Sequence, residues 1–131
     1  MTDLTATGGV PDSGRIGRVA VGDILRRAAK RFPDRVALTD GARQVTFTEI
    51  EHDANRFANY LVARGLKPGD KISTICNNSV EFVKALFGIH RAGLVWVPIN
   101  TMLGPSDMDY ILDHAPAGPA RGAGKARCRD R

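Results

Sequence analysis

Strand-like and helix-like segments alternate between residues 71 and 114 in steps of about 25 residues, and this alternation constrains the fold more than any other feature of the sequence. Residues 71–75 predict one strand, residues 94–99 predict the next, and a helical pattern lies between them. A tight turn cannot join parallel strands, so the pattern predicts parallel pairing through a right-handed crossover. Because residues 94–99 are apolar on both faces, we expect helices to cover this strand on each side.

The first half of the chain predicts a helix followed by a hairpin. Apolar residues at helical spacing predict a helix that ends before Pro33, and its apolar positions are Val21, Ile24, Leu25, Ala28 and Phe32. Segments 35–39 and 44–47 predict two short strands around a tight turn at residues 40–43. The sequence as a whole therefore predicts an α/β fold with a hairpin beside parallel strand–helix–strand units.

Capping and turn signals mark where the later elements begin. Thr48 and Glu51 have the spacing of a capping box, which predicts the start of a second helix. Residues 67–70 predict a type II turn before the strand at 71–75. Asn78 with Glu81 repeats the capping pattern, and Ser106 is expected to begin a last helix.

The net charge of +5 is concentrated at the C-terminal end of the chain. Residues 115–131 carry five basic residues and one acidic residue, and fourteen of these 17 residues are Ala, Gly, Pro or Arg. This composition is typical of GC-rich DNA read out of frame, so we expect a frameshift or truncation near codon 115 and a disordered basic tail at 115–131. Residues 1–20 are expected to be a flexible leader and residues 21–114 the folded region.

The absence of a signal peptide or apolar membrane segment, with two isolated cysteines, Cys76 and Cys128, predicts a cytoplasmic protein without a disulfide or cysteine-bound metal.

The folded region resembles the N-terminal part of the large domain of AMP-forming acyl-CoA synthetases, the adenylate-forming enzyme family. The resemblance covers about residues 21–114, and its ordered pieces lie at residues 31–38, 46–50, 65–72, 78–82 and 91–100. It implies an enzyme that joins a fatty acid or related carboxylate to ATP as an acyl adenylate and then transfers the acyl group to CoA. Such chemistry needs a phosphate-binding loop and Mg²⁺.

The resemblance also implies that the catalytic parts of the family are missing from this chain. Its phosphate loop, its ribose-binding Asp and its small C-terminal domain with the catalytic lysine have no counterpart here. Gly124-Lys125 is not a substitute, because the phosphate-loop spacing would require Gly at 119 and Ser or Thr at 126. We therefore expect a truncated ligase that is inactive alone, with no catalytic, cofactor-binding or metal-binding residue, although ATP, Mg²⁺ and CoA are implied for the intact family.

Residues of the types that bind ligands are interpreted as structural. The histidines, expected at the surface or half-buried, are His52, His90 and His114. Asp107 and Asp109 are expected to complement the positive start of the last helix, with cation binding as the alternative, and Asp113 is expected to be solvated. Trp96 is expected in the core, with acyl-chain contact in an intact relative as the alternative. The basic residues interpreted as a solvated helix face, or alternatively as a contact for anionic lipid, are Arg26, Arg27, Lys30 and Arg31.

Two other functions remain as alternatives. The basic tail could bind nucleic acid through phosphate contacts, but it has no aromatic residue for base stacking, and the near-neutral folded region does not extend the basic surface, so no nucleic acid is expected. An incomplete sheet would expose an unpaired edge, which favours self-association and a role as a non-catalytic interaction fragment of a full-length ligase.

Overall fold

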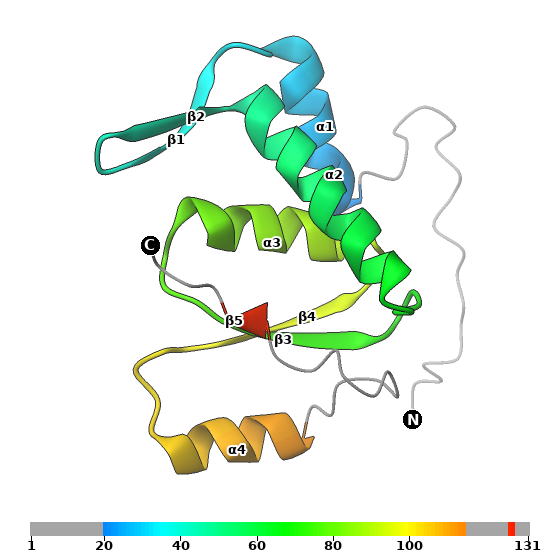
Figure 1. Ribbon diagram of the computed structural model, residues 1–131, viewed down its shortest axis with the longest axis vertical. Coiled ribbons are helices and arrows are strands. Elements are labelled where there is room, and N and C mark those ends of the chain that lie inside the picture. The colour runs from blue at the N-terminus through cyan, green and yellow to red at the C-terminus, as the bar shows by residue number, and fades with distance from the viewer. Residues whose placement is uncertain (1–19, 115–125, 128–131) are drawn as a thin grey trace, which may run out of the picture.

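The computed structural model describes residues 20–114 and 126–127, and Figure 1 shows how their elements are arranged. The elements in chain order are α1 (Val21–Arg31), β1 (Val36–Asp40), β2 (Arg43–Thr46), α2 (Phe47–Ala63), β3 (Lys71–Ile75), α3 (Val80–Arg91), β4 (Val95–Ile99), α4 (Pro105–His114) and β5 (Ala126–Arg127). The expected leader and basic tail lie outside the described residues, apart from Ala20 and the two residues of β5.

The hairpin forms where the sequence predicts it. β1 and β2 pair antiparallel with Asp40 opposite Arg43, which leaves a two-residue connection. Gly41 in this connection has a φ of 58°, the left-handed region that glycine adopts without strain. β2 ends at Thr46 and α2 begins at Phe47, so no loop separates the hairpin from this helix.

β3, α3 and β4 form the predicted parallel unit. β3 and β4 pair in parallel with Ile72 opposite Trp96, and β5 pairs in parallel with the other edge of β3. The sheet order over the described residues is β4–β3–β5, so β4 lies at an edge. An edge strand has no second neighbour to accept its amide protons, which explains why Pro98 is tolerated there.

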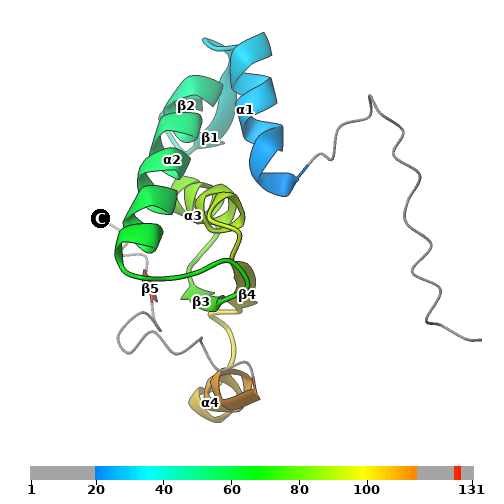
Figure 2. The same ribbon diagram turned by 90° about the vertical axis from the view of Figure 1, so that its right-hand side faces the viewer.

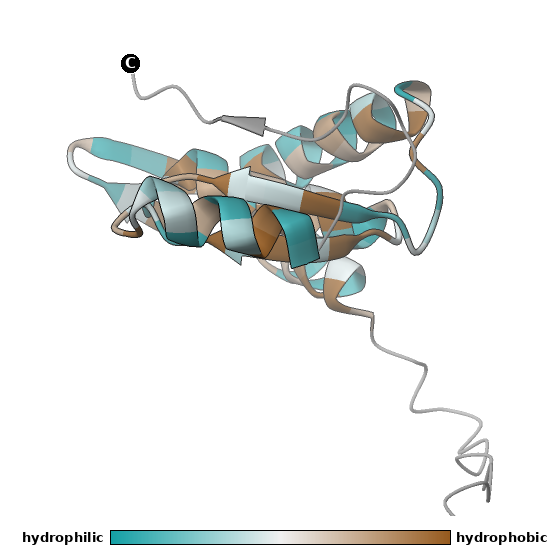
Figure 3. Ribbon diagram, turned by 90° about the horizontal axis from the view of Figure 1, so that it is seen from below, coloured by the Kyte–Doolittle hydropathy of each residue, from teal (hydrophilic) through white to brown (hydrophobic). Residues whose placement is uncertain are grey.

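Helices cover β4 less completely than the sequence predicts. In Figures 1 and 2, α2 and α3 lie on one side of the β3–β4 sheet and α4 lies on the other. Val95 is nevertheless 46% exposed, and no residue of α4 is buried. Figure 3 shows hydrophilic and hydrophobic residues interspersed along the helices and strands seen from the α4 side. Helices thus lie on both sides of β4, as the sequence predicts, but they bury the strand unevenly: Ile99 is buried whereas Val95 is exposed.

The start of α2 corrects the predicted capping box by two residues. Thr46 is the N-cap: its Oγ1 accepts a hydrogen bond from the Glu49 amide, and Glu49 Oε2 accepts one from the Thr46 amide at 2.8 Å. Two Thr-x-x-Glu pairs overlap in the sequence, and the pattern alone does not distinguish them. The hydroxyl of Thr48 instead donates to the Pro33 carbonyl at 2.9 Å.

The other helix ends follow the predicted signals more closely. Ser79, one residue after the predicted Asn78, caps α3 by accepting a hydrogen bond from the Phe82 amide at 3.2 Å. Gly65 and Gly93 follow the ends of α2 and α3 with φ values of 89° and 74°, which confirms both predicted stops. The turn before β3 is also confirmed, because Gly69 has a φ of 92° and the Asp70 amide donates to the Lys67 carbonyl at 3.0 Å.

Two clusters of buried side chains hold the helices against the strands. The cluster between α2, α3 and the sheet contains Leu61, Leu66, Ile72, Ala85, Ile89 and Leu94. The cluster between α1, the hairpin and the first turns of α2 and α3 contains Leu25, Val45, Ile50, Ala54 and Val80. Leu25 is the one large α1 side chain in a core cluster, whereas Ile24 is 49% and Phe32 40% exposed, so the predicted apolar face of this helix was only partly correct. Gly22 is the other buried residue of α1, and it faces α3 so closely that a Cβ built on it would lie 2.9 Å from Arg91 Cα.

Candidate functional site

A polar cavity of about 400 Å³ lies between β2, α2 and α3. Its lining residues are Arg43, Gln44, Val45, Thr48, Glu49, His52, Asp53 and Lys84. The hairpin contributes the first three, the first two turns of α2 contribute the next four, and α3 contributes Lys84. The lining thus brings together two cations and two carboxylates, without the excess of positive charge that a triphosphate would require.

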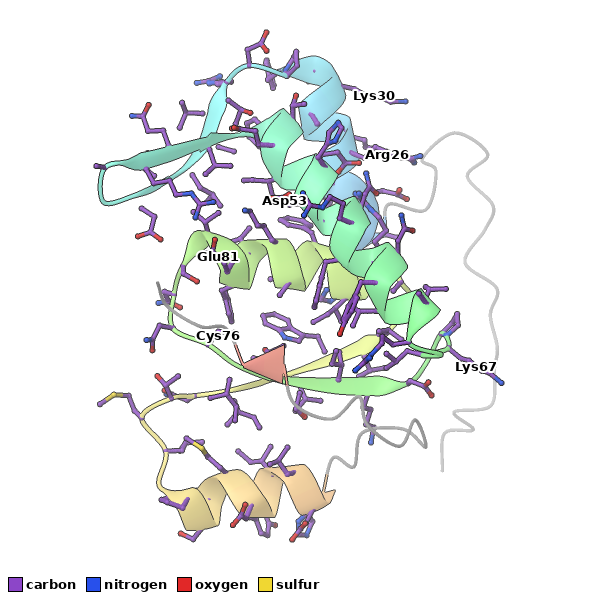
Figure 4. The ribbon with its side chains drawn as sticks, in the orientation of Figure 1. Arg26, Lys30, Asp53, Lys67, Cys76 and Glu81 are labelled. Atoms are coloured by element: carbon purple, nitrogen blue, oxygen red, sulfur yellow. The ribbon has the colours of Figure 1, made fainter. Side chains whose placement is uncertain are left out.

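Ion pairs neutralise the charges around this cavity. Arg43 Nη1 lies 2.8 Å from Glu81 Oε1, and Lys84 pairs with Asp53. The hydrogen bond from Arg43 lowers the pKa of Glu81 below its ordinary value, and Glu81 in turn raises the pKa of Arg43. Figure 4 shows Asp53 on α2 and Glu81 on α3, on the two helices that these pairs connect. The network ties the hairpin and α2 to α3.

Glu49, the remaining carboxylate of the cavity, belongs to the α2 cap. Hydrogen bonds from the backbone and side chain of Thr46 lower the pKa of Glu49. A general acid at neutral pH needs the opposite shift, as burial without a partner produces. The cavity therefore presents paired charges and a capping group, which is the arrangement of a structural junction.

Arg91 forms a second junction, between the three helices that the sequence places far apart. Its Nη2 donates to the Gly22 carbonyl at 2.6 Å and to Glu51 Oε2 at 2.8 Å, and its Nη1 donates to Asn55 Oδ1 at 2.6 Å. These partners are 36 to 69 residues away along the chain, so no local pattern could indicate them. Arg91 lies within one of the segments of resemblance, where its role was not predicted.

Trp96 lies on the sheet face that α3 covers. Its indole Nε1 donates to Thr74 Oγ1 at 2.9 Å, and its ring lies 5.2 Å from that of Phe82. The indole is half-buried and packs against the core cluster of α2, α3 and the sheet. These contacts support the predicted structural role of Trp96.

The structure keeps the other predicted candidates apart. His52 is exposed at the cavity, His90 is half-buried with Nδ1 2.8 Å from the Leu86 carbonyl, and His114 is exposed at the end of α4. Asp107, in the first turn of α4, and Asp109 and Asp113 are exposed. Over the described residues, no three His, Cys, Asp or Glu side chains are grouped closely enough to hold a metal ion, and no helix is long and apolar enough to cross a membrane.

The interpretation of Cys76 as an isolated thiol needs correction. Cys76, which follows β3, is disulfide-bonded. The chain has one other cysteine, Cys128, which lies outside the described residues, as does the rejected Gly124-Lys125 pair. Spacing along the sequence could not indicate a bond that depends on which segments become neighbours in the fold.

Comparison with known proteins identifies the family. The family model for AMP-binding enzymes matches residues 25–118, so the chain belongs to this family. A medium/long-chain-fatty-acid–CoA/3-oxocholest-4-en-26-oate–CoA ligase of Mycolicibacterium smegmatis is 37% identical over 95 residues, which are 72% of this chain and 17% of the relative. A 4-hydroxybutyrate–CoA ligase of Metallosphaera sedula is 37% identical over 91 residues, 70% of this chain and 17% of that relative. The chain thus spans about a sixth of the length of these relatives.

Solved structures confirm that this part of the fold is shared. Klebsiella oxytoca NpsA in complex with 3-hydroxyanthranilyl-AMSN matches with a TM-score of 0.75 and 27% identity, over 84% of this chain and 25% of that one. The anthranilate CoA ligase AuaEII in complex with anthranoyl-AMP matches with a TM-score of 0.72 and 32% identity, over 76% of this chain and 19% of that one. The α/β fold predicted from the sequence is therefore that of part of the N-terminal subdomain of adenylation enzymes.

Proposed function

We propose that this chain is the N-terminal segment of a CoA ligase that activates a fatty acid or a related carboxylate. The observation that carries the proposal is the 37% identity over 95 residues with a fatty-acid–CoA ligase, together with the family match over residues 25–118. ATP, Mg²⁺ and CoA are then the cofactors and co-substrates of the intact enzyme, which we place in the cytoplasm.

We further propose that the chain alone is a scaffold without adenylation activity. In support, the two junctions described above use their charged groups for ion pairs and caps, and none of them is left as a cradle for phosphate. The chain also spans only about a sixth of the length of the relatives that it matches. Among the described residues β4 lies at an edge of the sheet, which gives the segment a surface for further pairing, including self-association.

An adenylation assay on the purified chain tests the scaffold role. ATP, Mg²⁺ and a panel of fatty acids should release no more pyrophosphate than a blank without protein. Pyrophosphate release that depends on both the chain and the acid would show that the segment carries its own catalytic groups. The ligase class is tested by transplanting residues 25–114 into the Mycolicibacterium relative, where fatty-acid-dependent AMP formation should persist.

A further inference from the structure

Exposed apolar and basic side chains lie side by side on the outer surface of α1 and just beyond it. Ile24 and Phe32 are 49% and 40% exposed, and Arg27 and Arg31 between them are also exposed. Steps of three and four residues place Ile24, Arg27 and Arg31 on one side of the helix, and Phe32 and Arg35 follow its C-terminal end. The guanidinium carbons of Arg31 and Arg35 lie 5.2 and 5.7 Å from the centroid of the Phe32 ring. These five residues, Ile24, Arg27, Arg31, Phe32 and Arg35, are called the α1 patch.

The charges of the α1 patch are not neutralised by neighbouring acids. Over the part of the chain that the structure describes, no carboxylate oxygen lies within 4.0 Å of Arg27, Arg31 or Arg35. By contrast, Arg43 and Arg91 in the two junctions are both paired. The patch therefore combines positive charge that no neighbouring carboxylate pairs with exposed apolar area, over the residues that the structure describes.

The surroundings of the patch increase its positive charge. Residues 21–35 contain five basic and two acidic residues, whereas residues 1–114 as a whole carry nearly equal numbers of each. Figure 4 shows Arg26 and Lys30 pointing away from α2, into the space beside α1. Residues 21–35 thus carry a net charge of +3 (five minus two), although Arg26 itself pairs with Asp23 at 2.9 Å.

We infer that the α1 patch binds the surface of an anionic lipid bilayer. The arginines would contact the negatively charged headgroups, and Ile24 and Phe32 would enter the boundary between headgroups and acyl chains, as in amphipathic helices that bind membrane surfaces. A nucleic acid would also attract the arginines, but it offers no apolar layer for Ile24, so the exposed aliphatic side chain favours the bilayer. This inference does not depend on the ligase proposal, because binding to vesicles requires no chemistry.

Co-sedimentation of the full chain with vesicles tests this inference. Phosphatidylcholine vesicles with about 30% phosphatidylserine, at about 0.1 M salt, should bind the chain, and pure phosphatidylcholine vesicles should bind it much less. R27Q/R31Q should lower the partition coefficient about 25-fold, since each basic residue at an anionic surface contributes roughly a fivefold factor. The matched control R64Q/K67Q removes two exposed charges at the far end of α2 and should leave binding within about twofold.

Two further arms separate the bilayer from other anionic partners. Ile24→Ser should weaken binding to phosphatidylserine vesicles severalfold although it removes no charge. The inference is wrong if Ile24→Ser binds vesicles as tightly as the original chain, or if R27Q/R31Q and R64Q/K67Q lose binding equally. It is also wrong if the chain binds a labelled DNA duplex through Arg27 and Arg31 while failing to bind the vesicles. Circular dichroism of each variant verifies that it is folded before its binding is compared.

Discussion

Gly22 and Arg91 bring α1 and α3 into contact at the backbone: the Arg91 guanidinium donates to the Gly22 carbonyl at 2.6 Å, and a Cβ built on Gly22 would lie 2.9 Å from Arg91 Cα. A side chain at position 22 would therefore separate the two helices, and α1 would lose both its hydrogen bond and the burial of Leu25. Figure 2, which is turned from the view of Figure 1, shows that α1 lies beside α2 and above α3.

Gly22→Ala is expected to destabilise the fold by about 1 to 3 kcal/mol, the range found when extra atoms are forced into a packed contact. The free energy of unfolding in urea measures this effect. Gly104→Ala is the matched control, because a Cβ there meets only Asp107 Oδ2, at 3.8 Å. Equal stability of the two variants would show that α1 and α3 are not in close contact.

Arg91→Met should cost about 1 to 3 kcal/mol, because it leaves the largely buried carboxylate of Glu51 without its cation. The comparison is Arg26→Met, which breaks the exposed pair with Asp23 and should cost at most about 1 kcal/mol. Chemical denaturation of both variants measures the difference. A larger loss for Arg26→Met would contradict the role of Arg91 at the helix junction.

Thr46→Ala and Thr48→Ala distinguish the observed cap of α2 from the predicted one. Removing the cap hydroxyl of Thr46 should cost about 1 kcal/mol, in line with other N-cap substitutions. Thr48→Ala removes a single exposed hydrogen bond to Pro33 and should cost less. If thermal or urea unfolding ranks the two variants in the opposite order, Thr48 and Glu51 form the capping box and the observed assignment is contradicted.

Acid should destabilise the fold partly through Glu49 and Glu81. Their pKa values are lowered in the folded state by hydrogen bonds from Thr46 and Arg43, respectively. The stability they contribute is therefore fully present above their ordinary pKa of 4.5 and is lost as the pH falls through that value towards the lower folded-state pKa values. Between pH 6 and pH 3, E49Q/E81Q should lose less unfolding free energy than the original chain; an equal loss would contradict the assignment.

The sequence predicted those parts of the fold that depend on local chemistry. The hairpin turn at Gly41, the stops at Gly65 and Gly93 and the parallel pairing of β3 with β4 all follow from residue type and spacing. The errors arose where contacts in the folded structure, and not the local sequence, determine the cap of a helix or the burial of a strand. Two overlapping Thr-x-x-Glu pairs at the start of α2 are locally equivalent, and the second face of β4 depends on segments that the strand itself does not specify.

The junction residues were beyond prediction from one sequence for the same reason. Arg91 meets Gly22 across 69 positions, and Arg43 meets Glu81 across 38. Isolated arginines and glutamates are usually solvated, so nothing local distinguishes these from the exposed Arg27 and Arg31. The family, by contrast, could be predicted, because it depends on the order of several short segments and not on any single contact.

The most direct test of the account replaces the matching segment of the Mycolicibacterium ligase with residues 25–114 of this chain and measures AMP formation with a long-chain fatty acid and CoA. If the segment is a scaffold of this enzyme class, the chimera should retain AMP formation within about tenfold of the parent, an allowance of roughly 1.4 kcal/mol in the barrier. A folded chimera that forms no AMP would contradict the central claim.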